Sequence, residues 1–421
     1  MRVLYLCYDG LLEPLIQSQV LAYLERLSRH HEITLVTFEK PADLGRPEEI
    51  AALRRRCAGS GIRWVARRYH HRPRLLATLY DLAVFLVTAM RECRRGRAEL
   101  IHARGYIPVF VALATGWLLR RPYIFDMRSF WPDEMVSAGR MAMGSPLYRV
   151  LKRAERFCLK RARAVVVLTE AAVAHLSALP ELGPDRVSYT VIPTCADTGR
   201  FRPRPDRASP APPRLFATLG TVIGGWFLMD WLFAFWSASL AAFPELRFRI
   251  VSRDDAGAIR AAGAAYPAVL ERLEIGGLPP AGMPAAVAEF DVGAMFFTAD
   301  FSKLGSCPTR MGEMLACGCP VVANGAVGDV GEIIRRYRVG VVAEDSSAAS
   351  MRRTVGELAN LLQDADLARR CRAAAEDWFS LERGSARYDS LYRRIAGERM
   401  NDCGANPDRD KSGGNVLSEH R

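Results

Sequence analysis

The sequence lacks the cysteine patterns that mark a metal-binding or disulfide-bonded protein. Its 421 residues include 10 cysteines at irregular spacings, and no CxxC pair has a matching partner elsewhere in the chain. We therefore expect neither a zinc site nor a disulfide framework. The opening MRVLYLCYDG has the pattern of an apolar strand and a turn rather than of a signal peptide, which favours a cytoplasmic location.

The sequence also lacks an apolar run long enough to cross a bilayer. The stretch from Leu75 to Met90 has 16 residues and contains Asp81, whereas a spanning helix needs about 20 apolar residues. Arginines stand on both sides of it: Arg67, Arg68, Arg72, Arg74, Arg91, Arg94, Arg95 and Arg97. Two interpretations stay open, an ordinary core-facing helix and a helix that lies on an anionic membrane surface.

Negative charge is scarce in the first half of the chain. Residues 1–200 hold 31 Lys and Arg against 19 Asp and Glu, so the net charge of +12 of the whole protein lies there. This asymmetry predicts an anionic partner for the first half: a membrane surface, a phosphorylated substrate or nucleic acid. Nucleic acid is the least favoured of the three, because the arginines have no stacking aromatics interleaved with them.

The chain is too long for one core, and its pattern predicts two α/β domains. Apolar strand-like segments alternate with helical segments from RVLYLCY onward, and the alternation restarts at RLFATLG. Such alternation is typical of parallel sheets covered on both faces, so we expect two facing Rossmann-like domains. The Pro- and Arg-rich RFRPRPDRASPAPP between them indicates a linker. In the second domain, the segment NGAVGDVGEII predicts a turn into a helix capped by Asp329.

The segment after the predicted strand DVGAMFF has the features of an anion site. Ligands of parallel α/β sheets bind outside the carboxyl ends of the strands. Gly305, Ser306 and Thr309 are small enough to let backbone N–H groups approach an anion, and Pro308 suits the first turn of a helix. The free N–H groups and the dipole of that helix predict a phosphate site at its start.

Three charged residues complete this predicted site. Lys303 and Arg310 add positive charge beside the helix start. Glu313 lies one turn into the helix, where a carboxylate can accept hydrogen bonds from two adjacent ribose hydroxyls. A solvated helix face is the simpler interpretation of Glu313.

These residues resemble the donor-nucleotide signature of retaining GT-B glycosyltransferases, family 4, in the subset with S-P-T-K-x-x-E-x-L-A-x-G-x-P-V. Other segments match the layout of that family in order: RVLYLCYDG, IHARGYIP, YIFDMRSFWPDE, AVVVLTEAA, VIPTCADTGRFRP, LFATLGTVIGGW and FSLERGSARYDSLYRRI. The resemblance covers nearly all of residues 1–400 and implies a GT-B fold with an interdomain cleft. The expected parts are an acceptor- and membrane-facing domain (1–200), a linker (201–213), a donor domain (214–378), a helix that crosses back onto the first domain (379–400) and a disordered tail (401–421).

The resemblance implies a role for each matched residue on the donor side. Glu313 would bind the ribose, and Arg310 and Lys303 would face the diphosphate, with Ser306 and Thr309 at the helix start. The backbone N–H groups of Gly220 and Thr221 would approach the diphosphate. Arg253, which ends a strand, would either touch the base or phosphate or form a surface turn.

The resemblance also assigns residues of the first domain. Gly10 would lie in the loop next to the transferred sugar. Arg104, Asp126 and Arg128 would be the catalytic group at strand ends, with Asp126 either a carboxylate near the acceptor or a structural hydrogen-bond partner. Trp131 and Glu134 would either bind the acceptor sugar or fold their loop.

The chain departs from the family pattern at three places. Gly305 stands where the first glutamate of the donor pair is expected, the usual Arg and Lys are missing after Gly220, and Arg128 stands where many relatives have histidine. The D-x-D pairs, Asp364/Asp366 and Asp408/Asp410, lie far from any predicted strand-end loop.

The resemblance implies a metal-independent, retaining glycosyltransferase of the hexosyltransferase type, without a cofactor, working in polysaccharide biosynthesis. Its donor would be a nucleotide sugar, most simply a UDP-sugar, and its acceptor a lipid-linked or saccharide molecule at the inner face of the cell membrane. Two alternatives are a nucleotide-sugar epimerase of the same fold and a non-catalytic, anion-binding scaffold.

Overall fold

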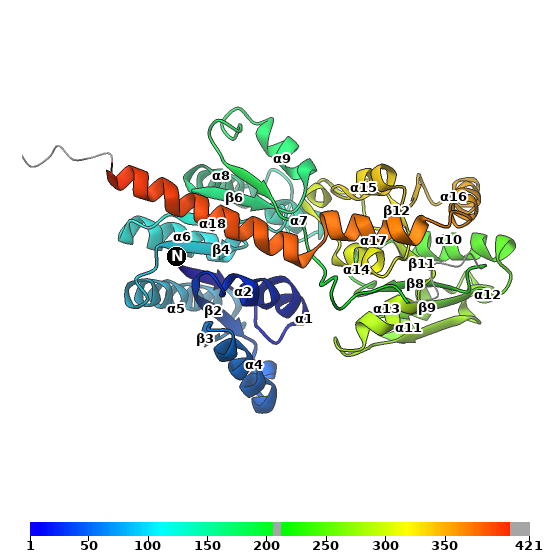
Figure 1. Cartoon of the computed structure of the whole chain (residues 1–421), viewed down its shortest axis with the longest axis horizontal. Coiled ribbons are helices and arrows are strands. Elements are labelled where there is room, and N and C mark those ends of the chain that lie inside the picture. Colours follow the sequence, from blue (N-terminus) through cyan, green and yellow to red (C-terminus); the bar gives the residue numbers. More distant parts are fainter. Residues whose placement is uncertain (205–211, 405–421) are drawn as a thin grey trace, which may run out of the picture.

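The computed structural model describes residues 1–204 and 212–404, which form two α/β domains, each built on one parallel sheet (Figure 1). The first sheet has the strand order β3-β2-β1-β4-β5-β6-β7, with β1 (Arg2–Cys7), β2 (Glu32–Glu39), β3 (Arg63–Arg68), β4 (Leu100–Arg104), β5 (Tyr123–Asp126), β6 (Ala164–Val167) and β7 (Tyr189–Val191). The second has the order β10-β9-β8-β11-β12-β13, with β8 (Leu215–Leu219), β9 (Arg247–Val251), β10 (Leu273–Gly276), β11 (Val292–Met295), β12 (Val321–Asn324) and β13 (Gly340–Ala343). The predicted α/β class with two parallel sheets is confirmed.

Helices cover both faces of the first sheet. One face packs against α1 (Pro14–Ile16), the π-helical η1 (Gln17–Leu21), α2 (Ala22–Leu27), α4 (Pro47–Gly59) and α18 (Leu381–Gly404). The other packs against α5 (Arg74–Arg95), α6 (Tyr106–Leu119), α8 (Pro146–Arg161) and α9 (Glu170–Ser177). Along β1, Val3 and Tyr5 enter the first of these cores while Leu4 and Leu6 enter the second. This two-sided burial explains the continuous apolar run of the opening strand.

The helices of the second domain share one continuous core with its sheet. They are α10 (Met229–Ala242), α11 (Ala256–Ala262), α12 (Pro267–Leu270), α13 (Met283–Glu289), α14 (Thr309–Ala316), α15 (Val330–Tyr337), α16 (Ala348–Leu361) and α17 (Leu367–Trp378). The 3₁₀-helix η3 (Phe301–Gly305) precedes α14, and its Leu304 packs against the core of the first domain. Two further helices of the first domain are α3 (Pro41–Leu44) and α7 (Trp131–Ser137). The helix predicted near Gln17 to Arg29 is a composite of α1, η1 and α2, which ends at Leu27.

The chain crosses between the domains twice, and the two crossings lie side by side. The Ala196 N–H donates to the Phe379 carbonyl (2.7 Å), and the Leu381 N–H donates to the Ala196 carbonyl (3.0 Å). We call these paired segments, residues 192–200 and 378–381, the hinge. Beyond it α18 runs back along the first domain (Figure 1), with Tyr388 and Tyr392 buried in that core.

Three predicted boundaries need comment. The crossing helix begins at Leu381 and extends to Gly404, so residues 401–404 of the predicted tail are helical. Residues 405–421 of that tail and residues 205–211 of the predicted linker lie outside the described residues.

Asp329 links the two domains. It directly precedes α15, as predicted, but its carboxylate does not cap that helix. The carboxylate accepts hydrogen bonds from the Glu170 N–H (2.8 Å) and the Ala171 N–H (3.0 Å), at the start of α9 in the other domain. The hydroxyl of Thr169 donates in return to the Leu304 carbonyl (2.6 Å). Because the first N–H groups of a helix lack intrahelical acceptors, Asp329 satisfies α9 across the domain boundary.

We expect Asp329→Ala to loosen the contact between the domains. Two N–H groups at the start of α9 would lose their acceptor, at a cost of about 1–3 kcal/mol to the closed arrangement. The radius of gyration from small-angle X-ray scattering should rise and the melting temperature should fall, with Asp329→Asn intermediate because it keeps one amide oxygen. Scattering and melting curves identical to those of the unaltered protein would contradict the link.

Candidate active site

The carboxyl ends of strands from both domains lie at the contact between the domains. In parallel α/β sheets this edge is where ligands bind. β4 and β5 end at Arg104 and Asp126 in the first domain, and β8 and β11 end at Leu219 and Met295 in the second. The loops that follow these strands carry most of the predicted site residues.

Arg310 is held in place by two rings and a carbonyl, yet part of its guanidinium has no partner. Its central carbon lies 5.2 Å from the ring centre of Phe227 and 5.3 Å from that of Phe297. Its Nη2 donates to the Thr221 carbonyl (2.9 Å), while its buried Nη1 has no hydrogen bond among the described residues. Burial lowers the pKa of Arg310 to about 10, although Glu313 acts against this change. The free Nη1 can therefore bind an anion.

Gly220 allows this arginine to approach the loop after β8. Its φ of +82° is in the left-handed region, and a Cβ there would lie 2.9 Å from Arg310 Nη2, so only glycine fits. Its N–H donates to the Val251 carbonyl (2.9 Å). The Gly220 N–H is therefore already engaged within the sheet, and its approach to a diphosphate stays a prediction.

Asp254 orders the rest of this loop and was not predicted. Its Oδ2 accepts hydrogen bonds from the N–H groups of Val222 (2.6 Å) and Ile223 (3.0 Å). Thr221 is left exposed before them. The neighbouring Arg253 is exposed at the end of β9. The sequence signal for the role of Asp254 was the Asp-Asp pair that directly follows the RFRIVS strand.

Lys303 is a buried cation without an ion pair among the described residues. Only 5% of its surface is exposed, and its ammonium lies 4.3 Å from the ring centre of Trp226. Burial lowers its pKa, with the charge of Glu134 acting against this. The aromatic ring partly compensates the charge. An anionic ligand would compensate it more fully.

Glu313 is a half-buried carboxylate on the same helix as Arg310. It makes no hydrogen bond or ion pair with any described residue, and burial raises its pKa to about 7 even though Arg310 and Arg200 lower it. Burying even part of a carboxylate without a partner is unfavourable. Such a group near the carboxyl ends of the strands is a candidate for ligand binding.

The start of α14 is covered by the first domain. Thr309 is the first residue of the helix, and Thr194 donates from the other domain to the Cys307 carbonyl (2.8 Å). The cavity that remains beside Ser306 and Pro308 has a volume of only about 10 Å³. This cavity fits no more than a water molecule, and the contact of Ser306 and Thr309 with a phosphate stays a prediction.

Gly305 also packs against the first domain. A Cβ at this position would lie 3.1 Å from the Cδ2 atom of the Phe130 ring. Phe130 in turn lies against Phe301, with ring centres 5.4 Å apart. The place of the first glutamate in the family motif is thus filled by a close contact between the domains.

Asp126 is completely buried in a network of hydrogen bonds and charges. Tyr388 of α18 donates to its Oδ2 (3.0 Å), and Arg128 donates to its Oδ1 (3.2 Å). His102 Nε2 lies 3.3 Å from Oδ2, and Arg104 Nη1 lies 3.9 Å from it. Burial alone would raise the pKa of Asp126, but Arg128, His102 and Arg104 hold it well below its usual value. The carboxylate stays ionised and exposes no surface to an acceptor.

The two arginines beside Asp126 line the first-domain side of the site. Arg104 is only 8% exposed, and its Nη1 has no hydrogen bond among the described residues. The Arg128 side chain is 16% exposed. Asp9, an exposed carboxylate in the loop after β1, lies within electrostatic reach of Arg104. Asp9 was not predicted as a site residue, although it stands directly before Gly10.

The loop that carries Gly10 is anchored by a buried glutamate at the end of β2. Both carboxylate oxygens of Glu39 accept from the Leu11 N–H, at 3.0 and 2.9 Å, and Thr37 donates to it (2.5 Å). Gly10 lies directly over this carboxylate. Glu39 was also missed, although a glutamate that ends an apolar strand is the signal for it.

Trp131 and Glu134 help to fold their loop. The Trp131 ring lies 5.6 Å from that of Tyr106, and Glu134 accepts from the Ser129 hydroxyl (2.7 Å). Both side chains remain partly exposed. These contacts fit the second of the two predicted roles and leave acceptor binding as a prediction.

Residues 16–195 match the family described as a glycosyl transferase 4-like domain. A comparison with curated proteins finds no similar sequence. No helix among residues 1–204 and 212–404 is both long and apolar enough to span a bilayer.

Several solved structures resemble the whole chain. The sucrose-phosphate synthase of Thermosynechococcus elongatus matches with a TM-score of 0.66 at 15% identity, covering 94% of this chain and 99% of that one. Anabaena HepE in complex with UDP matches with a TM-score of 0.67 at 15% identity, covering 95% and 100%. A putative UDP-N-acetylglucosamine 2-epimerase from Listeria monocytogenes matches with a TM-score of 0.55 at 12% identity, covering 94% and 97%.

These structural matches establish the two-domain α/β GT-B fold and confirm the predicted fold class. The family match supports a glycosyltransferase. Because the fold also occurs in the epimerase, the activity has to be argued from the residues of the site.

Proposed function

We propose that this protein is a metal-independent, retaining glycosyltransferase that moves a sugar from a nucleoside-diphosphate sugar to a lipid-linked or saccharide acceptor at a membrane surface. One observation carries the proposal. Three charged side chains on the donor side lack partners among the described residues: the buried Lys303, the half-buried Glu313, and Arg310 at its buried Nη1. A nucleoside diphosphate supplies the matching groups, because its phosphates are anionic and its ribose donates hydrogen bonds.

The cations stabilise the leaving group in this reaction. Charge develops on the diphosphate as the bond to the sugar breaks, and preorganised donors in a shielded site are most effective there. Arg310 supplies its free Nη1, and Lys303 approaches from η3. Since these charges come from the protein, the reaction needs no metal ion.

A UDP-sugar is the simplest donor. HepE, which shares the fold, was solved in complex with UDP and with UDP-glucose. In this chain Glu313 would accept hydrogen bonds from the two ribose hydroxyls. Arg253 and the exposed Thr221 stand at neighbouring strand ends where the rest of the nucleotide would lie.

Retention of configuration follows from attack on the same face that the diphosphate leaves. The bond between the anomeric carbon and the phosphate oxygen breaks as the acceptor hydroxyl oxygen bonds to that carbon. The acceptor proton passes to the departing phosphate oxygen. Arg104 and Arg128 face this event from the first domain, and Asp126 acts as a positioning residue that orients them.

The epimerase alternative is less well supported by the site. It needs carboxylates from both domains at the sugar, and Asp126 on the first domain is fully buried. A non-catalytic scaffold would keep the donor site but form no product, so turnover separates it from the transferase.

The acceptor side of the proposal rests on an apolar surface rimmed with arginine. Helix α5 exposes Leu79, Tyr80 and Val87 along one stripe, while Asp81 and Phe85 on its other side are buried. The helix therefore has features of both interpretations of its sequence: one face packs on the core and the other exposes apolar residues. A stripe of this kind with flanking arginines is typical of helices that lie on anionic membranes.

Two neighbouring helices extend this surface. The exposed apolar residues of α6 and α8 are Trp117, Leu118, Leu147, Val150 and Phe157. Exposed arginines lie among and beside them: Arg91, Arg94, Arg120, Arg153 and Arg161. We call the surface of α5, α6 and α8 the arginine-rimmed apolar face. An anionic bilayer satisfies both its apolar area and its charge.

Glu313→Gln should weaken UDP binding and remove the part of its pH dependence that comes from Glu313. In the presence of EDTA, titration calorimetry at pH 8 should show a loss of about 1.5–3 kcal/mol, tenfold or more in affinity. Because the pKa of Glu313 is about 7, only its ionised form above that pH accepts both hydroxyls fully, so the affinity of the unaltered protein should rise from pH 6 to pH 8. The phosphate of UDP titrates in both proteins, so the difference between their pH profiles isolates Glu313.

The control for this experiment is the exposed Glu357→Gln on α16. The unaltered protein should also lose affinity for 2′-deoxy-UDP, whereas Glu313→Gln should not distinguish the two nucleotides. Absence of binding to UDP, GDP and ADP would refute the donor site. Binding without sugar transfer to any acceptor would leave the scaffold as the better function.

Asp126→Asn should destabilise the protein strongly at every pH near neutrality. Removing one partner of a buried charge network costs about 3–5 kcal/mol, because Arg128 is left without its counter-charge. The folded pKa of Asp126 lies below its unfolded value of about 4. Its stabilisation is therefore fully present above that value and is lost only as pH falls through the folded pKa. Urea unfolding should show the same loss at pH 5 and pH 8.

The exposed pair of Asp366 and Arg369 provides the comparison, and Asp366→Asn should change stability little. An effect of Asp126→Asn no larger than that of Asp366→Asn would count against the network. So would a loss that changes between pH 5 and pH 8.

The arginine-rimmed apolar face should bind vesicles that contain phosphatidylglycerol. Leu79→Asp/Val87→Asp should reduce co-sedimentation at least about tenfold, because it removes two apolar contacts and adds negative charge. Leu278→Asp, an exposed apolar position of the second domain, is the matched control. Binding should also weaken with salt. Equal sedimentation of both variants would show that another surface meets the lipid.

A further inference from the structure

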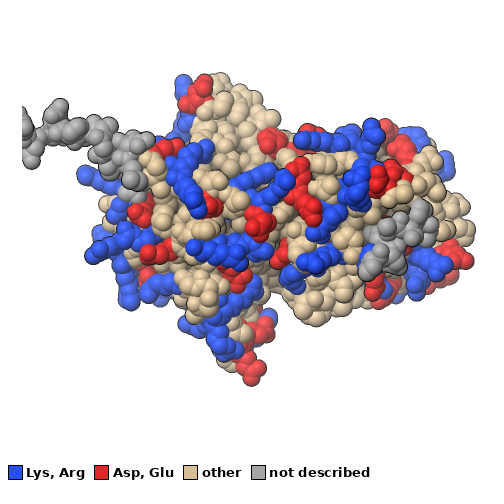
Figure 2. Space-filling model, viewed as in Figure 1, with Lys and Arg blue, Asp and Glu red and all other residues tan. Residues whose placement is uncertain are grey.

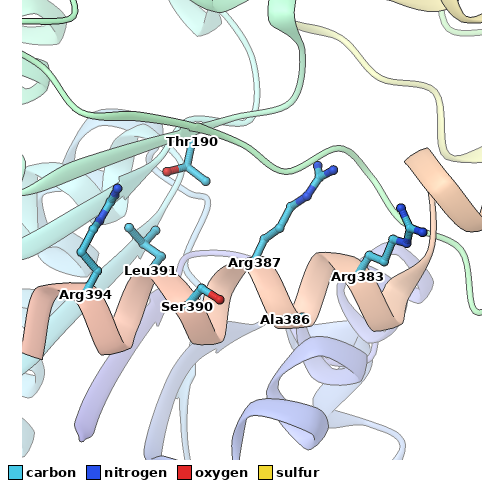
Figure 3. Close-up of a pocket in the computed structure, with 7 residues that line it drawn as sticks. All are labelled: Thr190, Arg383, Ala386, Arg387, Ser390, Leu391 and Arg394. Atoms are coloured by element: carbon cyan, nitrogen blue, oxygen red, sulfur yellow. The ribbon is translucent and has the colours of Figure 1, made fainter.

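A second basic site lies along the C-terminal helix, where α18 passes the edge strand β7. The structure has a groove of about 480 Å³ here, lined by Thr190, Arg383, Arg387, Ser390, Leu391 and Arg394 (Figure 3). None of these residues belongs to the candidate active site or to the arginine-rimmed apolar face. We call it the α18 groove.

The three arginines form one stripe on α18. Positions 383, 387 and 394 recur at helical spacing, so their side chains leave the same face of the helix (Figure 3). At a rise of 1.5 Å per residue the stripe is about 16 Å long. Ser390 lies between them, and the buried Leu391 forms part of the floor.

Two of the three guanidinium groups have only neutral partners. Arg387 donates to the Val191 carbonyl (3.1 Å), and Arg394 donates to the Ser188 hydroxyl (3.2 Å). Neither makes an ion pair with a described residue. Glu170 is near enough to feel the charge of Arg387 but does not reach ion-pair distance. Each guanidinium keeps most of its five N–H donors free for a ligand.

Acidic partners are present on the helix but serve its other faces. Arg393 pairs with Asp389 (2.9 Å), and Glu398 pairs with Arg163 (2.6 Å). Among the described residues, Arg383 is the one arginine of the groove with an acidic partner, Asp377. Positive charge is therefore concentrated on this side of α18, and Figure 2 shows lysine and arginine side chains gathered over the face that the helix crosses.

The size and chemistry of the groove select a class of ligand. Its volume is within the range of about 300–1,000 Å³ for small-molecule sites. Planar guanidinium groups bind phosphate oxygens in pairs. The spacing of the arginines favours a ligand with two or more anionic groups, and Ser390 and Thr190 add hydroxyls beside them.

We infer that the α18 groove is a binding site for a small polyphosphorylated anion, separate from the donor site. Arg387 contacts Val191, directly before the first crossing segment of the hinge. An anion held by Arg387 therefore lies against the segment about which the domains join.

The probe for this site is sodium tripolyphosphate, titrated by calorimetry in EDTA with the donor site saturated by UDP. Arg387→Ala/Arg394→Ala should weaken binding at least about tenfold, because it removes two charged donors. Arg369→Ala/Arg393→Ala removes the same charge from exposed, acid-paired positions and should leave binding unchanged. If UDP does not bind, Arg310→Ala/Lys303→Ala replaces it as the means of disabling the donor site, so the two proposals are tested separately.

A second variant guards against loss of folding. Ser390 is exposed, so Ser390→Glu places a carboxylate among the arginines without removing their existing contacts. It should weaken tripolyphosphate binding as much as the double arginine variant, with an unchanged melting temperature. Equal binding by all variants, or no binding by the unaltered protein at millimolar tripolyphosphate, would overturn the inference. Tighter binding of an acidic peptide than of tripolyphosphate would overturn the ligand class.

Discussion

The buried carboxylate of Asp126 joins the first-domain side of the cleft to the C-terminal helix. It receives hydrogen bonds from Arg128 and from Tyr388 of α18, and His102 lies beside it and beside Tyr392. A carboxylate in this position stays ionised only while these partners surround it. The orientation of the arginines at the site therefore depends on α18 lying on the first domain. Since α18 continues from the hinge, the same contact also fixes the position of the hinge on the first domain.

The charged residues Lys303, Arg310 and Glu313 differ from Asp126, because they are buried or half-buried but incompletely paired among the described residues. Lys303 has an aromatic ring in place of an anion, and one nitrogen of Arg310 has no acceptor. The pKa of Glu313 is raised by burial rather than lowered by a partner. Such groups make the free protein less stable than paired groups would. A ligand with both phosphates and hydroxyls would supply the missing partners of these groups and so offset the loss of stability.

Local sequence patterns predicted the sheets, the start of α14 and the residues on that helix that share the donor side. They did not predict contacts that join distant parts of the chain. The partners of Asp126 include Tyr388, 262 residues away, and those of Asp329 include Glu170, 159 residues away. The hydrogen bond from the Gly220 N–H was not predicted for the same reason, since its acceptor, the Val251 carbonyl, belongs to a neighbouring strand. Gly305, read from the motif as a missing glutamate, is explained by Phe130, whose position depends on how the domains meet.

Charge counted along the chain also gave an incomplete view of the surface. The second half is neutral by composition, yet it contributes α18, which lies on the basic first domain (Figure 1). On that helix the acids pair with arginines away from the groove: Asp389 with Arg393, and Glu398 with Arg163. Pairing, rather than the number of arginines, leaves Arg387 and Arg394 with neutral partners. A basic site can therefore arise in a segment whose net charge does not predict it, because the fold determines which charges are paired.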